Sequence, residues 1–157
     1  MSNIHEEKAV EYYFHNFNCT QGVFTTYAIE HGIDEKLALK LATNFGGGAR
    51  KGEMCGAVSG ALMVLGLLYG HSESDDLDTK AKAYAITEEY MNRFIKKNGC
   101  PSDCCCALGL SPSSPSPTLL SKGTSMGVVL LQTMGDRGSP TGWSLARGLL
   151  PGTSGQS

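Results

Sequence analysis

The predicted fold is decided by residues 55–69, which read Cys-Gly-Ala-Val-Ser-Gly-Ala-Leu-Met-Val-Leu-Gly-Leu-Leu-Tyr. Wound as a helix, this run is apolar on almost every side, which is typical of a buried helix. It is too short to cross a membrane, because a membrane-spanning helix needs about 20 apolar residues. We therefore predict a central, buried helix from Met54 to Tyr69 that ends at Gly70.

Two glycines of this helix, Gly56 and Gly60, lie four residues apart on one face. Glycine inside a helix costs about 1 kcal/mol relative to alanine, so a helix that keeps several glycines must gain from their small size. Two explanations remain open for Gly56 and Gly60. Either another helix packs tightly against them, or a cofactor lies there.

Further helices, separated by clear stops, flank this run on both sides. We expect them at about residues 3–15, 19–31, 34–45 and 76–97, and the last of them begins near Asp76 or Asp78. Ser2 or Asn3, and then Asp34, are candidate N-caps, and Gly32 and Gly99 are typical of helix ends. No segment alternates apolar and polar residues as a half-buried strand does. The sequence therefore predicts an all-α fold, a small bundle of about five helices.

Two of the expected helices carry an apolar stripe, the usual sign of a face turned toward a core. In the third helix, Leu37, Leu41 and Phe45 recur at every fourth position. The stripe of the fifth helix consists of Ala83, Ile86, Tyr90 and Phe94.

The composition changes sharply along the chain. Residues 1–100 hold 23 of the 28 charged side chains, whereas Gly, Pro, Ser and Thr make up 29 of the last 51 residues. A stretch of that second kind is typical of disorder, because it has too little apolar surface to form a core. We predict a helical domain over residues 1–110 and a disordered Gly/Pro/Ser-rich tail over residues 111–157.

Charge and cysteine content narrow the class of protein. The 157 residues carry a formal net charge of −2, which does not favour binding to nucleic acid. Residues 1–18 contain Glu6, Glu7 and Lys8 where a signal peptide needs an apolar stretch, so we expect a cytoplasmic protein without membrane insertion. Six cysteines in a cytosolic chain indicate redox or metal chemistry rather than a disulfide framework.

Two cysteines lie at expected helix starts, Cys19 at the second helix and Cys55 at the fourth. The positive end of a helix dipole favours the thiolate over the thiol, and the thiolate attacks disulfides and binds metals. Both residues are therefore candidates for redox chemistry. The alternative is that they are small buried hydrophobic residues, as cysteines without a disulfide often are.

The other cysteines follow the fifth helix, at Cys100, Cys104, Cys105 and Cys106. A structural zinc ion or an iron–sulfur cluster usually has four protein ligands. The candidate metal ligands are Cys19, Cys55, Cys100 and Cys104. Their spacing matches no known metal signature, since the chain lacks two CxxC pairs.

A glycine-rich loop, Gly46-Gly47-Gly48-Ala49-Arg50-Lys51-Gly52, joins the third and fourth helices. Gly47, Gly48 and Arg50, followed by a helix N-terminus, form a candidate site for an anion or a cofactor. The loop matches neither the phosphate-binding Walker sequence nor the dinucleotide-binding motif. Two alternatives to such a site remain open. The loop is simply exposed, or its cations lower the pKa of Cys55.

Several of these segments together resemble one family. They are Asn18-Cys19, Phe45 to Gly48, Gly52 to Leu62 and Phe94 to Gly99. They are similar to the small bacterial C_GCAxxG_C_C proteins, which are described as redox-active, and the element Cys-Gly-Ala-x-x-Gly is Cys55 to Gly60 here. The resemblance covers about residues 5–110 and implies an all-helical fold. Members are often encoded near transporter genes, which implies a link to a membrane transporter.

The resemblance also assigns cysteines. Cys19 and Cys55 match the first two of the four that name the family, and Cys104 matches the third, with Cys100 as the alternative. The fourth is expected downstream, but no cysteine follows Cys106. Either another cysteine of this group takes the fourth role or the site is incomplete. We also hypothesise a shift of reading frame near residues 101–106, which a helical, cysteine-bearing continuation in another frame of the coding DNA would support.

Three functions are consistent with the sequence. The first is an oxidoreductase-like protein for thiol–disulfide or electron transfer, with Cys19, Cys55 and Cys104 as catalytic residues and an unidentified redox partner. The second is a metal- or iron–sulfur cluster-binding module that uses the same cysteines. The third is a non-catalytic helical interaction domain with the cysteines in its core. A bundle without its last helix would expose apolar surface, so homo-oligomers are expected.

Overall fold

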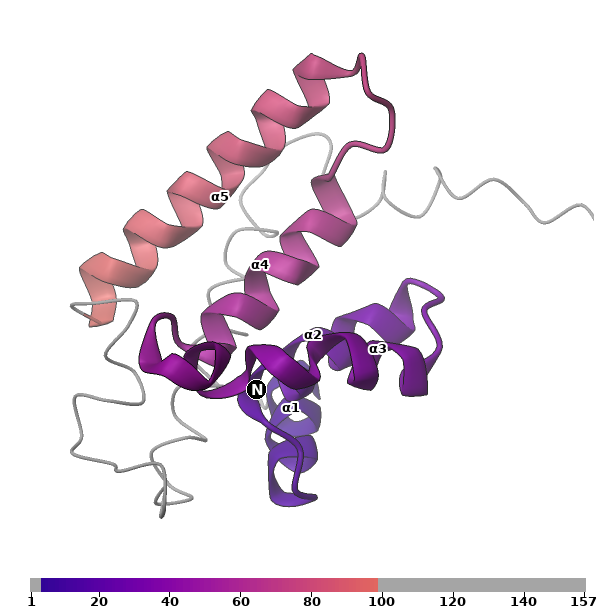
Figure 1. The fold of residues 1–157 in the computed structure, drawn as a ribbon, viewed down its shortest axis with the longest axis vertical. Helices are drawn as coiled ribbons and strands as arrows, with labels where there is room; N and C mark the ends of the chain where they lie inside the picture. Colours follow the sequence, from indigo (N-terminus) through magenta and orange to yellow (C-terminus); the bar gives the residue numbers. More distant parts are fainter. Residues whose placement is uncertain (1–3, 99–157) are drawn as a thin grey trace, which may run out of the picture.

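The computed structural model describes residues 4–98, which form five α-helices (Figure 1). The α-helices are α1 (Ile4–Phe14), α2 (Cys19–Glu30), α3 (Glu35–Ala42), α4 (Gly56–Tyr69) and α5 (Leu77–Asn98). Two short helical turns, η1 (Thr43–Phe45) and η2 (Gly48–Gly52), join α3 to α4. Residues 4–98 contain no strand, and the prediction of an all-α fold with about five helices is confirmed. The predicted caps Ser2 and Asn3, the stop at Gly99 and the tail lie outside the described residues.

Local signals in the sequence place most helix ends. Asn18 is the N-cap of α2, and Asp34 caps α3 by accepting a hydrogen bond from the N–H of Leu37 at 3.0 Å. Asp76 is the residue before α5, and it accepts a hydrogen bond from the N–H of Thr79, in the first turn of that helix, at 3.0 Å. Gly32 has φ +80°, the left-handed conformation that glycine adopts easily after a helix. The predicted helix starts at Asp34 and Asp76 are therefore confirmed.

The central helix of the described part is α2, and the prediction that α4 would take this place is wrong. Ten of the 12 residues of α2 are buried, and the helix packs against α1, α3 and α4. Seven of the 14 residues of α4 are buried, and Leu67 is exposed. Small and polar residues such as Thr20, Thr25 and Thr26 let α2 enter the core, and this hides its burial from a hydropathy pattern.

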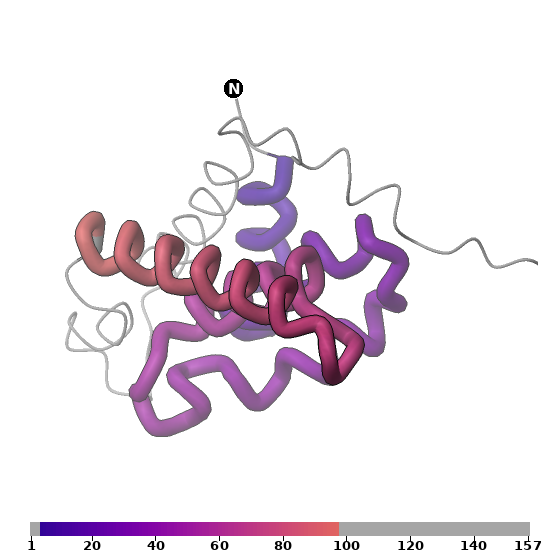
Figure 2. The backbone as a smooth tube through the Cα atoms, turned by 90° about the horizontal axis from the view of Figure 1, so that it is seen from above, coloured from indigo at the N-terminus to yellow at the C-terminus, as the bar shows by residue number. Residues whose placement is uncertain are grey.

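The remaining long helix, α5, runs antiparallel to α4 and lies beside it (Figure 1). Seen from above, α5 crosses over the rest of the helical core (Figure 2). Tyr90 and Phe94 are fully buried, and Ile86 packs against the core cluster. The predicted apolar stripe of α5 is confirmed at these three positions.

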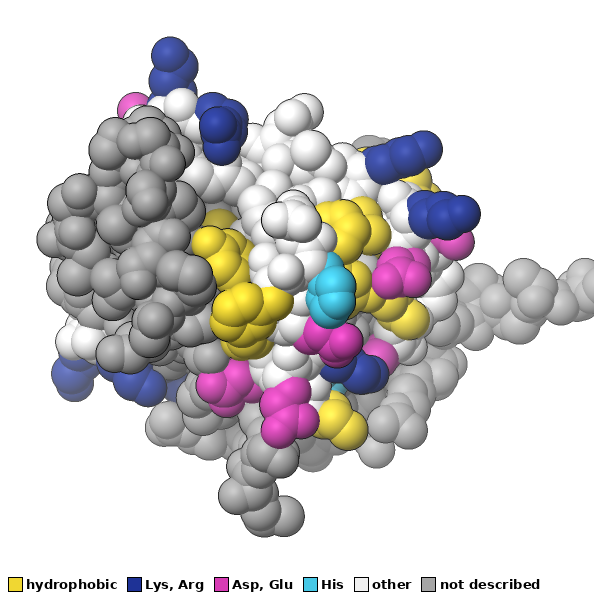
Figure 3. All heavy atoms as spheres, turned by 90° about the horizontal axis from the view of Figure 1, so that it is seen from below, with side chains coloured by type: hydrophobic (Ala, Val, Ile, Leu, Met, Phe, Trp, Pro, Cys, Tyr) yellow, Lys and Arg dark blue, Asp and Glu magenta, His cyan; other side chains and the backbone are white. Residues whose placement is uncertain are grey.

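The apolar stripe of α3 points away from the core. Leu37, Leu41 and Phe45 are 50%, 51% and 46% exposed, whereas Ala38 and Ala42 are fully buried. The expectation that the stripe faces the core is therefore wrong, because α3 packs against α2 through the face that carries the small side chains of Ala38 and Ala42. Hydrophobic side chains also reach the surface on the face shown in Figure 3, beside a histidine and several acidic groups.

Among residues 4–98, no helix is both long enough and apolar enough to span a membrane.

Candidate functional site at two helix N-termini

The two cysteines of the described region lie at the starts of α2 and α4, as predicted. Cys19 is the first residue of α2, and Cys55 is the N-cap residue of α4. Both side chains are buried, with exposed fractions of 3% and 2%. The N-terminal end of each of these two helices therefore carries one buried cysteine side chain.

The closest approach between the two helix starts is at Gly56. A Cβ atom added at Gly56 would lie 2.2 Å from the Sγ of Cys19 and 2.7 Å from the Oγ1 of Thr20. Real Cβ atoms do not approach other atoms that closely, so only glycine fits here. The thiol of Cys19 thus reaches the residue that directly follows Cys55.

A hydrogen bond fixes this approach. The Oγ1 of Thr20 donates to the carbonyl oxygen of Gly56 at 2.8 Å, and both groups are buried. A buried hydrogen bond between side chain and backbone satisfies the hydroxyl and sets the relative position of the two helices. Thr20 was missed by the sequence analysis, because a threonine inside a helix gives no signal of a contact 36 residues away.

A capping box holds the start of α2. The Oδ1 of Asn18 accepts the N–H of Gln21 at 3.0 Å, and the Oε1 of Gln21 accepts the N–H of Asn18 at 2.9 Å. The same two side chains reach the end of α3. Asn18 Nδ2 donates to the carbonyl of Thr43 at 2.8 Å, and Gln21 Nε2 donates to the carbonyl of Leu39 at 2.9 Å. The Asn-x-x-Gln pattern would have revealed the box in the sequence.

The predicted cofactor-binding glycines of α4 face α2. A Cβ at Gly60 would lie 2.9 Å from the carbonyl oxygen of Thr20 and 3.0 Å from the Cβ of Val23. The close approach of α2 therefore accounts for both Gly56 and Gly60. Their role in binding a cofactor stays a prediction.

The glycine-rich loop has a left-handed backbone. Gly47, Gly48, Ala49 and Arg50 have φ values of 63°, 64°, 53° and 63° in succession. Arg50 and its neighbour Lys51 are exposed. The proposed anion- or cofactor-binding role of Gly47, Gly48 and Arg50 stays a prediction.

The other predicted ligands, Cys100 and Cys104, lie outside the described residues. Within residues 4–98, no three His, Cys, Asp or Glu side chains come together as a metal ion would require. The predicted set therefore contributes two sulfur ligands from the described region, Cys19 and Cys55.

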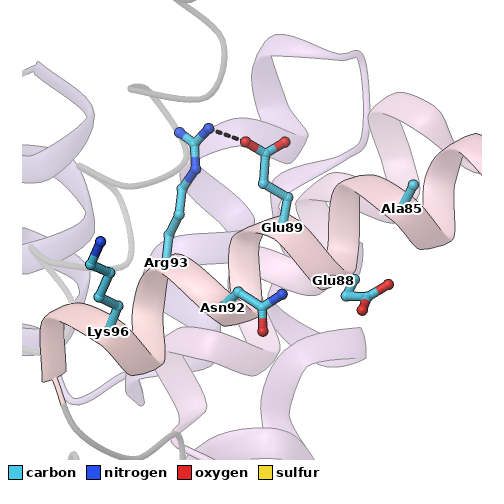
Figure 4. A pocket seen from close by; sticks show the side chains of 6 residues that line it. All are labelled: Ala85, Glu88, Glu89, Asn92, Arg93 and Lys96. Carbon is cyan, nitrogen blue, oxygen red and sulfur yellow. Dashed lines mark hydrogen bonds and ion pairs between the residues drawn. The ribbon is translucent and has the colours of Figure 1, made fainter.

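Two other features lie apart from the predicted site residues. At the other end of α2, the ring of His5 stacks on Tyr27 with centroids 4.7 Å apart, and its Nε2 lies 2.9 Å from an oxygen of Glu30. Burial, with a smaller contribution from the charge of Glu30, raises the pKa of Tyr27. The pocket in Figure 4, about 380 Å³ in volume, is lined by six residues of α5: Ala85, Glu88, Glu89, Asn92, Arg93 and Lys96.

Comparison with known proteins identifies the family. No curated protein and no solved structure shows a significant match to this chain. A family model with the description "Putative redox-active protein (C_GCAxxG_C_C)" matches residues 17–124. The matched segment contains both helix N-termini and all six cysteines. Because the match covers more than half of the sequence, the chain belongs to the C_GCAxxG_C_C family, whose description is redox-active.

Proposed function

We propose that this protein is a thiol–disulfide redox protein in which Cys19 and Cys55 form the reactive pair. The observation that carries the proposal is the position of the Cys19 sulfur, against the residue that follows Cys55. A disulfide needs two Cα atoms about 4.4–6.8 Å apart, and the contact between the Cys19 sulfur and Gly56, the neighbour of Cys55, supports such a pairing. The family description supports redox chemistry without naming the cysteines that perform it.

The reaction is an exchange with a disulfide of a partner protein. The Cys55 thiolate attacks one sulfur of that disulfide, so a Cys55–partner bond forms and the first partner sulfur leaves as a thiolate. Cys19 then attacks the Cys55 sulfur, which forms the Cys19–Cys55 bond and releases the second partner sulfur. The partner gains two electrons and takes up the two protons that the cysteines lose. The chain gives up the same two electrons.

We assign the attacking role to Cys55 because it is the N-cap residue of α4, where the helix dipole stabilises a thiolate. Cys19 is the resolving residue, held in place by the capping box of α2. Cys104 is the alternative resolving residue. Its support is the family resemblance, which matches it to the third of the four family cysteines.

A metal or iron–sulfur centre on the same cysteines is the competing function. Its support is the burial of two sulfur atoms at adjoining helix starts, since thiolates at such positions also bind metals. Such a centre would use Cys19 and Cys55 with two ligands from the cysteines after α5. The test below distinguishes the two functions.

The test is oxidation of the full chain after anaerobic purification, with metal analysis and a visible spectrum of the same sample. We expect a colourless, metal-free protein in which oxidised glutathione links Cys19 to Cys55, seen as a cross-linked peptide that has lost two hydrogen atoms. Cys19→Ser should retain glutathione on Cys55, because nothing resolves the mixed disulfide. Cys55→Ser should retain much less glutathione on Cys19. Each of the two variants is the matched control for the other.

Two results would overturn the proposal. Near-stoichiometric iron or zinc that protects both cysteines from alkylation would make them ligands. Failure of both cysteines to oxidise at any glutathione ratio would make them core residues of an interaction domain.

A further inference from the structure

The segment from Gly46 to Glu53, here called the strap, adopts an unusual backbone conformation. Four successive residues, from Gly47 to Arg50, have φ between 53° and 64°. Glycine adopts this left-handed conformation freely, whereas in alanine and arginine the Cβ crowds the backbone. The strap therefore has a backbone conformation that the side chains of Ala49 and Arg50 disfavour.

The strap begins beside the contact between Cys19 and Gly56. Its first residue, Gly46, is buried, and its Cα is 3.3 Å from the position that a Cβ of Gly56 would occupy. The Sγ of Cys19 is 2.2 Å from that same position. Figure 1 shows this loop beside the start of α4, where Cys55 is the N-cap residue. Gly46, the first residue of the strap, and the Cys19 sulfur thus both border Gly56.

Tight fits at two glycines define the closed position of the strap. A Cβ at Gly46 would lie 2.4 Å from the Cγ of Asn18, and one at Gly48 would lie 2.6 Å from the backbone nitrogen of Glu53. The turn is closed by a hydrogen bond from the N–H of Glu53 to the carbonyl of Gly48 at 3.4 Å. That distance exceeds the usual range of about 2.7–3.2 Å, so this bond adds little to the closed state.

A disulfide partner must reach the sulfur atoms of the cysteine pair before it can react. Thiol–disulfide exchange brings a second pair of sulfur atoms to Cys55, but the side chains of Cys55 and Cys19 are 2% and 3% exposed. Some part of the fold must move before a protein disulfide reaches them. The strap ends two residues before Cys55 and carries the backbone strain.

We propose that the strap is a gate over the cysteine pair, and that strain at Ala49 and Arg50 favours its opening for a disulfide partner. The inference rests on the proposed thiol–disulfide function. Closed, the strap keeps water and small oxidants from the thiols. Open, it releases the left-handed residues to ordinary conformations and exposes Cys55.

The test measures alkylation of Cys55 by iodoacetamide in the reduced full chain, with the label located by peptide mass spectrometry. In low urea, we expect a labelling rate almost independent of urea concentration, because opening of the strap exposes little surface. Labelling through global unfolding would instead rise with urea as steeply as the unfolding equilibrium itself.

Two substitutions at Ala49, which is exposed, should move the rate in opposite directions. Ala49→Gly relieves the strain of the closed strap, so labelling should slow about five-fold. Ala49→Val places a branched side chain at a positive φ, so the strap should open more often and labelling should accelerate about five-fold or more. Ala81→Gly, at an exposed position of α5, is the control and should leave the low-urea rate unchanged.

Each failure has its own signature. A full urea dependence of labelling, or equal rates in the two Ala49 variants, would overturn the gate while glutathione could still link Cys19 to Cys55. Conversely, strap-dependent alkylation without any Cys19–Cys55 disulfide would keep the gate and overturn the proposed exchange reaction.

Discussion

At the scale of single residues, the contact between Cys19 and Gly56 determines the site. Any side chain at position 56 would occupy the space of the Cys19 sulfur, since the Cβ would lie 2.2 Å from it. Packed interiors have no spare volume for such an atom, so either the thiol rotates away or the helices separate. Glycine at this position keeps the two helix starts together.

Gly56→Ala should therefore destabilise the protein by about 1–3 kcal/mol, the usual cost of overpacking a core. It should also slow formation of the Cys19–Cys55 disulfide, because the sulfur of Cys19 is displaced. Gly66→Ala is the matched control in the same helix, where an added Cβ meets nothing within 4 Å. It should stabilise the protein by about 0.5–1 kcal/mol through helix propensity. Urea unfolding measures both effects, and equal shifts of the two midpoints would contradict this account.

Part of the site could be predicted from sequence at this scale. The N-terminal positions of Cys19 and Cys55 follow from local signals: Cys19 comes directly after the N-cap Asn18, and Cys55 opens a long apolar run. That Thr20 bonds to Gly56 depends on the crossing of two helices, which no local pattern encodes. The glycines indicated a close approach, and the structure identifies α2 as the element that approaches.

At the scale of helices, the start of α2 connects two elements through one side chain. Asn18 caps α2 and also donates to the carbonyl of Thr43 at 2.8 Å, in the turn after α3. Cap hydrogen bonds and tertiary hydrogen bonds each contribute about 1 kcal/mol to stability. The cap thereby positions Cys19, the next residue in the chain, relative to α3.

We expect Asn18→Ala to cost about 2 kcal/mol of stability, because it removes both interactions. Asp34→Ala is a suitable comparison, since Asp34 caps α3 from an exposed position with the bond to Leu37. Its cost should be about 1 kcal/mol. Thermal or urea unfolding of the two variants measures the loss of stability in each. Equal costs would mean that the bond from Asn18 to Thr43 contributes nothing.

Helix positions were largely predictable because caps and glycine stops act locally. The orientation of a helix is a different matter, as α3 shows. Its leucines form the more apolar face, yet Ala38 and Ala42 face α2, because the two helices pack closely. A hydropathy pattern measures how apolar a helix face is, whereas close packing against α2 requires the face with the smallest side chains.

At the scale of the whole molecule, two tyrosines link folding to high pH. Burial is the main cause that raises the pKa of Tyr12 to about 12, and its bond to Glu35, at 2.6 Å, adds to it. The pKa of Tyr27 is raised too, by burial and then by the charge of Glu30. Above pH 10 the unfolded chain loses phenolic protons that the folded chain keeps, so stability must fall as pH rises.

The stability provided by Tyr12 should be complete below pH 10 and disappear as the pH rises to about 12. Tyr12→Phe removes this ionisation, so its urea midpoint should fall less steeply between these two pH values. At neutral pH the variant should be about 1 kcal/mol less stable, because the bond to Glu35 is lost. Tyr84→Phe, at a side chain that is 64% exposed, is the control. An unchanged pH slope in Tyr12→Phe would contradict the assignment.

The global arrangement was the least predictable level. The sequence indicates the number and class of the elements, but the centre of the bundle went to α2 instead of α4. The buried residues of α2 include Thr20 and Gln21, whose polar groups find partners on other elements only after the helices have assembled. Such residues resemble surface residues until their neighbours are known.

The burial of α2 has a consequence for how this family can vary. A helix made of small and polar residues fits between three neighbours only while its side chains keep their size and hydrogen bonds. Its positions should therefore tolerate few substitutions. The more apolar helix α4 should accept many near Gly66 and Leu67, which lie at the surface. Evolutionary constraint in this domain should follow the closeness of packing rather than hydrophobicity, with its most restricted positions in the helix that looks most like a surface helix.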